Sequence, residues 1–220
     1  MSSLVNTSDT IKRAIERDSA IRKDLGRGLI NIRGLARLIQ TAAQAEGEEL
    51  SLEATISAIR RYPISESVAS HENIGRLLKK LTMKNKIVDV AILNDPEIPA
   101  ALGKFASQID YSRGETFRIV AGVESIRVVI DGKNLERMKS IIPKKSIRKV
   151  VTDLAEIIIS LADVADRTPG VVSAVTTELA MNGINMIEFM SCVPELIIVV
   201  DEKDALRSYD SLEKLSKGVF

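Results

Sequence analysis

The sequence predicts an α+β protein in which a small all-α unit precedes two tandem βαββαβ modules. Three observations support this prediction. Apolar residues recur at helical spacing over the first sixty residues, strand-like runs follow from about residue 86, and part of this second region matches itself after a shift of seventy residues. The predicted domains are 1–81 for the helical unit, 82–152 for the first module and 153–220 for the second.

The composition is that of a soluble globular protein. Of the 220 residues, 45% are apolar and 28% are charged, with 31 basic against 30 acidic side chains. This balance gives no overall electrostatic signal for nucleic acid or membrane. The apolar runs are far shorter than the roughly 20 residues of a membrane span, and the N-terminus lacks a signal-peptide pattern. We therefore expect a cytoplasmic protein without membrane partners.

The helical unit is predicted from apolar periodicity over 11–29 and again after Asn31. Asn31 and Ser51 are expected N-caps, and the helix after Ser51 should end near residue 62, before a proline. A further helix is predicted to end near residues 84–85; its apolar positions are Ile74, Leu77, Leu78 and Leu81.

The first module begins with a strand over 87–93. Asp95-Pro96-Glu97 then forms a strong helix start, with Asp95 as the expected cap, for a helix that runs to about Gln108. The remaining elements are strands at 117–121 and 125–130, a helix from Lys133 to about Ile142 that Pro143 ends, and a closing strand at 147–152.

The repeat places Phe117–Ile142 over Ile187–Leu212 without a gap. Upstream of the second block lie a strand at 155–161, the Thr168-Pro169 turn and a helix over 171–182, so the order of elements repeats as well. The identical pairs are Val123 and Val193, Val129 and Val199, Asp131 and Asp201, Lys133 and Lys203, and Arg137 and Arg207. A single irregular α+β domain without a repeat is the alternative.

Each copy is a split βαβ unit, whose antiparallel sheet has helices on one face and needs cover on its edges. Side-by-side pairing of the copies would cover two edges and leave two exposed. The sequence therefore predicts a homodimer or a higher homo-oligomer formed through sheet edges.

The second copy closely resembles the ACT module in the regulatory part of aspartokinases, which has a ferredoxin-like fold. The motifs that match are Asp166-Arg167-Thr168-Pro169-Gly170-Val171-Val172 and Leu179-Ala180-Met181-Asn182-Gly183-Ile184-Asn185-Met186-Ile187. The resemblance covers about 153–220 and extends more weakly to 86–150. It implies allosteric sensing of small molecules, usually amino acids, at interfaces between paired modules. By the same resemblance, the ligand-binding candidates are Asp166, Thr168, Gly170, Val171, Val172 and Asn185.

The chemistry of this loop agrees with a ligand site. Pro169 starts a helix whose first amides lack intrahelical acceptors, and Gly170 lets a ligand approach the backbone. Such an N-terminus favours an anion such as an amino-acid carboxylate, and Asn185 offers a donor and acceptors. Thr-Pro-Gly is also an ordinary helix start, and Gly183 with Asn185 an ordinary helix stop.

The first copy has Pro96-Glu97-Ile98 at the corresponding turn, which places a carboxylate beside the same amides. An anionic ligand should be repelled there. We therefore expect an asymmetric pair, with the second module as the sensor and the first as scaffold.

The N-terminal unit resembles a helix-turn-helix, in which residues 28–37 enter the second helix and 52–62 form the third. Placed in a major groove, the third helix would bring four arginines to phosphate or guanine, namely Arg33, Arg37, Arg60 and Arg61. Dimerisation or protein docking is the alternative, and the acidic residues over 46–53 would oppose DNA.

No catalytic or cofactor motif is present: the chain lacks a phosphate-binding glycine loop, a dinucleotide fingerprint and a nucleophile elbow. One cysteine and one histidine allow neither an internal disulfide nor a metal cluster of such ligands. We expect Cys192 to be packed in a strand and His71 to lie at the surface. Acidic caps are expected at three strand-to-helix junctions, Asp131, Asp201 and Asp204.

The leading hypothesis is a non-catalytic, amino-acid-sensing regulator that needs no cofactor and signals to DNA or a partner protein. It resembles predicted ACT-containing regulators of amino-acid metabolism from archaea. The alternatives are a regulatory subunit or degenerate relative of an amino-acid biosynthetic enzyme such as aspartokinase, and a purely structural oligomerisation module.

Overall fold

A computed structural model describes residues 7–63 and 74–218. It divides the chain into two compact units, 1–67 and 68–220. Within the described part, no helix combines the length and apolar character that crossing a membrane requires. His71 lies outside the described residues.

The first unit consists of helices packed on a small apolar core. They are α1 (Thr7–Arg17), α2 (Ser19–Gly26), α3 (Ile32–Ala45) and α4 (Leu52–Arg60). The buried residues include Ile11, Ile15, Leu35, Ile39 and Ile59. Over residues 7–63, four helices stand where three were predicted, because the chain turns at Asp18, whose carboxylate accepts hydrogen bonds from the amides of Ala20 and Ile21.

The two predicted N-caps of this unit are confirmed. The side chain of Asn31 accepts a hydrogen bond from the Gly34 amide at 3.0 Å. The hydroxyl of Ser51 accepts one from the Ala54 amide at 3.5 Å, so its bond is the longer of the two. Both caps supply an acceptor to amides that the helix itself leaves unpaired.

The second unit is built on one antiparallel sheet with strand order β2-β3-β1-β4-β6-β5. The strands are β1 (Leu78–Leu93), β2 (Phe117–Ala121), β3 (Ser125–Asp131), β4 (Ile147–Leu161), β5 (Met186–Cys192) and β6 (Glu195–Asp201). The helices are α6 (Ile98–Ala106), α7 (Leu135–Ile141), α8 (Val171–Met181) and α9 (Ala205–Lys217). The sheet therefore has β2 and β5 at its two edges.

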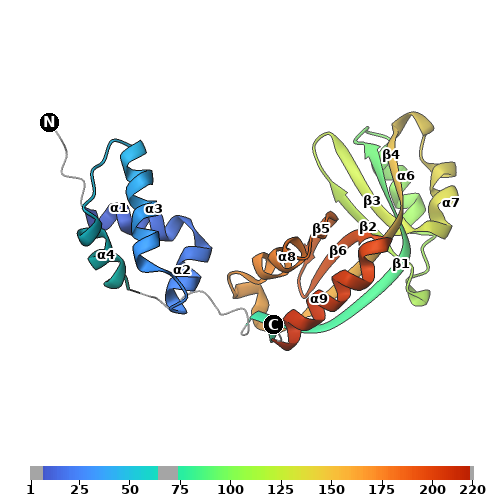
Figure 1. Cartoon of the computed structure of the whole chain (residues 1–220). Helices are drawn as coiled ribbons and strands as arrows, with labels where there is room; N and C mark the ends of the chain where they lie inside the picture. Colours follow the sequence, from blue (N-terminus) through green and yellow to red (C-terminus); the bar gives the residue numbers. More distant parts are fainter. Residues whose placement is uncertain (1–6, 64–73, 219–220) are drawn as a thin grey trace. The chain divides into compact units, whose positions relative to one another are not determined.

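The long central strands β1 and β4 run through both halves of the sheet (Figure 1). Residues 87–93 of β1 pair with β3, and 87–92 pair with 147–154 of β4. Residues 78–84 of β1 pair instead with 156–161 of β4, which pairs in turn with β6. We call β2, β3, 87–93 and 147–151 the first half-sheet, and β5, β6, 78–84 and 154–161 the second.

The two half-sheets meet where both central strands are irregular. The register shifts on either side of the pair Ile87 and Leu154, so each strand carries a bulge. Lys86 on β1 and Asp153 on β4 have φ angles of 58° and 57°. Non-glycine residues rarely adopt this left-handed conformation, and the two of them mark a line along which the sheet bends.

Each half-sheet has its own pair of helices and its own core. The first packs α6 and α7 over a cluster that includes Val90, Phe105 and Val128. The second packs α8 and α9 over another, with Ile157 and Ile198 at its centre. The opposite faces of the half-sheets, which we call the inner faces, contact each other through a third cluster of Ile87, Val129, Leu154 and Val199.

The predicted helix over 74–84 is wrong from Leu78 onward, where β1 begins. Its leucines suit a helical spacing, but Leu81 and Met83 pack on the second core and Lys84 lies on the inner face. Pairing with β4, whose partner residues lie 72 to 83 positions further along the chain, overrides the local preference. The seventy-residue repeat matches the bounds of one pair of strands, since β3 and β6 begin at 125 and 195 and end at 131 and 201. The other repeated elements differ in length: β2 and β5 span 117–121 and 186–192, and α7 and α9 span 135–141 and 205–217.

Five smaller expectations are corrected. Cys192 is exposed, because it ends β5 at a hairpin. None of the helices after Asp131, Asp201 and Asp204 has a side-chain cap, since these carboxylates pair with Lys84, Lys203 and Arg207. Asp95 does not cap α6 either; its carboxylate accepts a hydrogen bond from the Ser146 hydroxyl at 3.3 Å.

Candidate functional site

The loop from Asp166 to Val172 leads from the second half-sheet into α8. Gly170, the N-cap of α8, has a φ angle of 96°, and no side chain caps this helix. Because the first intrahelical bond here runs from the Ala174 amide to the Gly170 carbonyl, the preceding amides have no acceptor within the helix. These amides could receive a carboxylate.

The candidate side chains around this turn differ in what they can offer. Asp166 is exposed, with its carboxylate 3.8 Å from the guanidinium of Arg167. The Thr168 hydroxyl donates a hydrogen bond to the Val164 carbonyl at 2.7 Å. Val171 is buried in the second core, whereas Val172 is 43% exposed. A ligand at this turn would therefore meet the backbone, Asp166 and Val172, while Val171 holds the helix in place.

Gly170 also has a structural role. A β-carbon at this position would lie 3.3 Å from Cδ1 of Ile74, and the φ angle is one that other residues avoid. The turn thus favours a glycine chiefly for its backbone conformation, whether or not a ligand binds.

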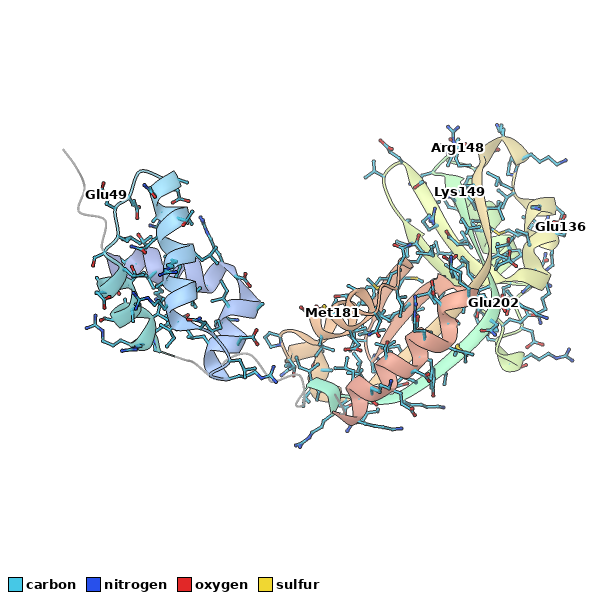
Figure 2. The ribbon with its side chains drawn as sticks, viewed as in Figure 1. Glu49, Glu136, Arg148, Lys149, Met181 and Glu202 are labelled. Atoms are coloured by element: carbon cyan, nitrogen blue, oxygen red, sulfur yellow. The ribbon has the colours of Figure 1, made fainter. Side chains whose placement is uncertain are left out.

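Asn185 lies apart from the other candidates. It is exposed and precedes β5, beyond the C-terminal end of α8, where Met181 lies (Figure 2). The 11 residues of α8 rise by about 16 Å at roughly 1.5 Å per residue, which separates Asn185 from the turn at Gly170. A single amino acid cannot span that length. Within one chain, the structure brings five of the six candidates together and leaves Asn185 at the other end of the helix.

A shallow hollow of about 290 Å³ does lie near that other end. It is lined by residues of α8 and α9 and by the residue that follows α8: Glu178, Asn182, Arg207, Asp210, Ser211 and Lys214. None of the predicted ligand residues lines it. Several of its polar groups are already paired, since Asn182 binds Glu178 and Arg207 binds Asp204.

The corresponding turn of the first half-sheet is occupied by a paired carboxylate. Glu97 precedes α6 as its N-cap residue and lies 3.3 Å from the amine of Lys145. This arrangement keeps negative charge at the start of α6.

The four arginines of the predicted DNA-binding face are all exposed. Arg33 and Arg37 lie one turn apart on α3, and Arg60 ends α4. Among the described residues, these three form no ion pair. Arg61 donates a hydrogen bond to the Ser57 carbonyl at 3.3 Å.

Charged residues between the inner faces form a site that the sequence interpretation missed. Asp89 of β1 has no exposed surface and is paired with Arg127 of β3 in the same half-sheet. Arg127 also reaches the second half-sheet, where its Nε lies 2.7 Å from Oε1 of Glu188 on β5. One guanidinium is thus shared by two carboxylates, one from each half-sheet. Lys149 lies on the neighbouring strand β4 (Figure 2).

Further polar contacts join the half-sheets. Arg118 of β2 lies 3.1 Å from Oε1 of Glu156, a residue of β4 with 1% exposure. The amine of Lys84 lies 2.6 Å from a carboxylate oxygen of Asp131. Thr116 accepts a hydrogen bond from Lys84 and donates one to Glu156.

Burial raises the pKa of Asp89 from 3.8 to about 6, because loss of water around the carboxylate outweighs the attraction of Arg127. The nearby Glu188 raises it further, while Lys149 lowers it. Outside this cluster, the pKa of Glu115 is lowered from 4.5 to about 2, chiefly by its hydrogen bond with Lys133 and by that with the Asp110 amide.

One signal in the sequence could have indicated the inner-face cluster. Asp89 interrupts the apolar strand Ile87-Val88-Asp89-Val90, and Glu156 interrupts Leu154-Ala155-Glu156-Ile157. A charged residue within a central strand requires a partner in the fold. The partners themselves could not be identified, because they lie on other strands.

The fold of the second unit is similar to that of the regulatory parts of aspartokinases, which have an ACT-type fold. Neither a protein-family model nor a curated protein matches the sequence. The regulatory subunit of aspartate kinase from Thermus flavus is similar with a TM-score of 0.52 and 12% identity, covering 63% of this chain and 98% of that one. The ligand-free regulatory subunit of aspartate kinase from Thermus thermophilus has a TM-score of 0.50 and 14% identity, and the match covers 66% of this chain and 98% of that one.

The allosteric aspartate kinase of Clostridium acetobutylicum gives a TM-score of 0.52 at 17% identity, covering 63% of this chain. This chain spans 35% of the length of that enzyme, but nearly the whole length of the separate regulatory subunits. At such identities the likeness is one of fold.

Proposed function

We propose that this chain is a non-catalytic regulatory protein that binds an amino acid through its second ACT module. The feature that supports this most directly is the uncapped turn at Gly170, which opens α8 with free amides on a fold like that of aspartokinase regulatory parts. The amides would bind the carboxylate common to all amino acids.

The proposed modules follow the half-sheets, with one exchange of strands. The first comprises 87–93, α6, β2, β3, α7 and 147–152. The second comprises 154–161, α8, β5, β6 and α9, and takes its closing strand from 78–84, ahead of the first module in the chain. Each module then has its strands in the order of a split βαβ sheet.

Asn185 implies that the site is completed by a second copy. Because α8 separates it from Gly170 within one chain, one ligand could contact both only if the turn of one chain met Asn185 of another. The proposal therefore includes a homo-oligomer with the ligand between second modules.

Thermal unfolding of the full chain with each proteinogenic amino acid at millimolar concentration tests the proposal. A ligand that binds only the folded state stabilises it by about 2.7 kcal/mol at a hundredfold excess over Kd, which should raise the Tm by several degrees. If no amino acid raises the Tm, the proposal is wrong.

Asn185→Ala should abolish the ligand-induced shift while leaving the Tm of the free protein unchanged, since this side chain is exposed. Asn182→Ala is the matched control, because Asn182 is also exposed and lies three residues away. Its shift should persist. Equal loss in both variants would argue against a specific role for Asn185.

A regulatory subunit of an amino-acid biosynthetic enzyme is the second candidate. It is favoured by the match to nearly the whole length of separately existing regulatory subunits of aspartate kinase. In that case the ligand-bound chain should alter the activity of a partner enzyme, and the amino-acid shift would still be observed.

For the output of the signal, we propose the helical unit, with DNA as its partner. The exposed arginines Arg33, Arg37, Arg60 and Arg61 support this. Binding to mixed-sequence duplex DNA, followed by fluorescence anisotropy, should weaken steeply as salt rises. The double variant Arg60→Ala with Arg61→Ala should bind at least about tenfold more weakly, a loss of 1.4 kcal/mol.

Arg17→Ala, an exposed arginine at the end of α1, is the control and should bind as the unchanged protein does. If neither rising salt nor the double variant weakens the binding, these arginines do not form a DNA-binding face. Docking of a partner protein would then remain as the output.

A further inference from the structure

The two half-sheets are joined by two strands that are irregular where they cross from one to the other. Only β1 and β4 pass from one to the other, and each has a bulge and one left-handed non-glycine residue there, Lys86 and Asp153. Residues other than glycine adopt this conformation at a cost in free energy, and bulges interrupt the regular ladder. The bulges and the two left-handed residues gather along this line, which marks it as the place where the sheet bends.

Across this line the inner faces hold charge as well as apolar contacts. Arg127 belongs to the first half-sheet and is 27% exposed in its side chain, while Glu188 belongs to the second and is 19% exposed. Asp89, on the same half-sheet as Arg127, contacts Nη2 of the same guanidinium from a fully buried position, whereas Glu188 contacts its Nε. Its Oδ1 has no hydrogen-bond partner within the described residues.

We propose that Arg127 is a switchable clamp across the bend between the half-sheets, closed by Glu188 and weakened when ionised Asp89 competes for the guanidinium. Protonated Asp89 attracts Arg127 less, so the guanidinium is left to Glu188 and the inner faces are held together. Ionised Asp89 divides the guanidinium between its own half-sheet and the other. This inference does not depend on the proposed ligand.

The charged groups around Asp89 are consistent with a response to pH. Arg127 from β3 and Lys149 from β4 favour its ionised form, whereas Glu188 from β5 and burial favour its neutral form. With a pKa of about 6, Asp89 changes charge within the range that cells experience.

Distances between two spin labels on the full chain test the clamp. Cys192, the one cysteine of the sequence, is exposed at the end of β5 and takes the first label. Val123→Cys, at a position 96% exposed between β2 and β3, takes the second. The labels then report on opposite half-sheets.

We expect one narrow distance distribution near pH 5 and a broader one near pH 8, where an about tenfold larger population of separated half-sheets should appear. Glu188→Gln should give the broad distribution at both pH values. Asp89→Asn should give the narrow one at both.

Glu213→Gln, which removes an exposed ion pair with Lys217 on α9, is the matched control and should follow the unchanged protein. A distribution that neither pH nor Glu188→Gln alters would overturn the clamp. So would equal broadening in Glu213→Gln. Circular dichroism of each variant establishes that it is folded before distances are compared. If Glu188→Gln unfolds, Arg127→Lys provides a second test, because lysine keeps the charge but not the forked donors of arginine.

Discussion

Asp89 is a carboxylate with no exposed surface in a central strand. Burying a charge is costly unless it is paired and hydrogen-bonded, and here only one of its two oxygens is paired. A single arginine also serves Glu188, so neither carboxylate has a partner of its own. At the scale of the residue, burial makes the ionisation of Asp89 unfavourable, and the shared Arg127 offsets that cost only in part.

Stability should therefore depend on pH through Asp89. Because its folded-state pKa of about 6 exceeds the unfolded value of 3.8, the folded state binds the proton more tightly. Its contribution to the free energy of unfolding should fall as pH rises from about 4 to about 6, by up to about 3 kcal/mol at 1.36 kcal/mol per pKa unit.

Urea unfolding of the unchanged protein and Asp89→Asn over this range measures the effect. The difference between the two curves isolates Asp89 from other carboxylates, among them Glu115, whose lowered pKa has the opposite sign. The unchanged protein should lose stability relative to Asp89→Asn as pH rises. Parallel curves would contradict the assigned pKa.

Single elements were predicted well where their signals are local. The caps at Asn31 and Ser51, the helix over 171–181 and the paired strands of both hairpins all depend on residues close in sequence. The strand at 78–84 was not predicted, because its leucines and lysines suit a helix as well as a strand and its pairing partner lies far along the chain in β4. The ligand candidates at the α8 turn could likewise be predicted as a group, because they are close together in the sequence. Their separation from Asn185 could not be predicted in this way, because it depends on the position of α8 in the fold.

The cap of α3 allows a test at this scale. Asn31→Ala removes a 3.0 Å hydrogen bond to the Gly34 amide, which should destabilise the helix by about 1 kcal/mol. Hydrogen exchange of peptides covering 32–45 should then be about fivefold faster. Ser51→Ala is the comparison: its bond of 3.5 Å is longer, so exchange in α4 should rise less. Equal effects in the two helices would show that bond length does not decide the difference.

At the scale of the whole molecule, the second unit is more entangled than two modules in sequence. The boundary predicted at 82 falls inside β1, and the one at 152 falls inside β4, next to the bulges. The two half-sheets share both strands, so neither could be cut out at those boundaries without losing a strand. This connection allows a change at one half-sheet to reach the other through the bend and the Arg127 clamp that we propose.

The sequence by itself determined the helical start, the β-rich second region, the seventy-residue repeat and the glycine turn at 170, because each is recorded in periodicity or in neighbouring residues. Only the tertiary structure decided that 78–84 is a strand, that β1 and β4 join the half-sheets, and that Asp89 and Glu188 share Arg127. The sharing of Arg127, for example, depends on Asp89, 38 positions away in the same half-sheet, and on Glu188, 61 positions away in the other. A pattern in the chain shows which side chains are to be buried, but their partners follow from pairing and packing.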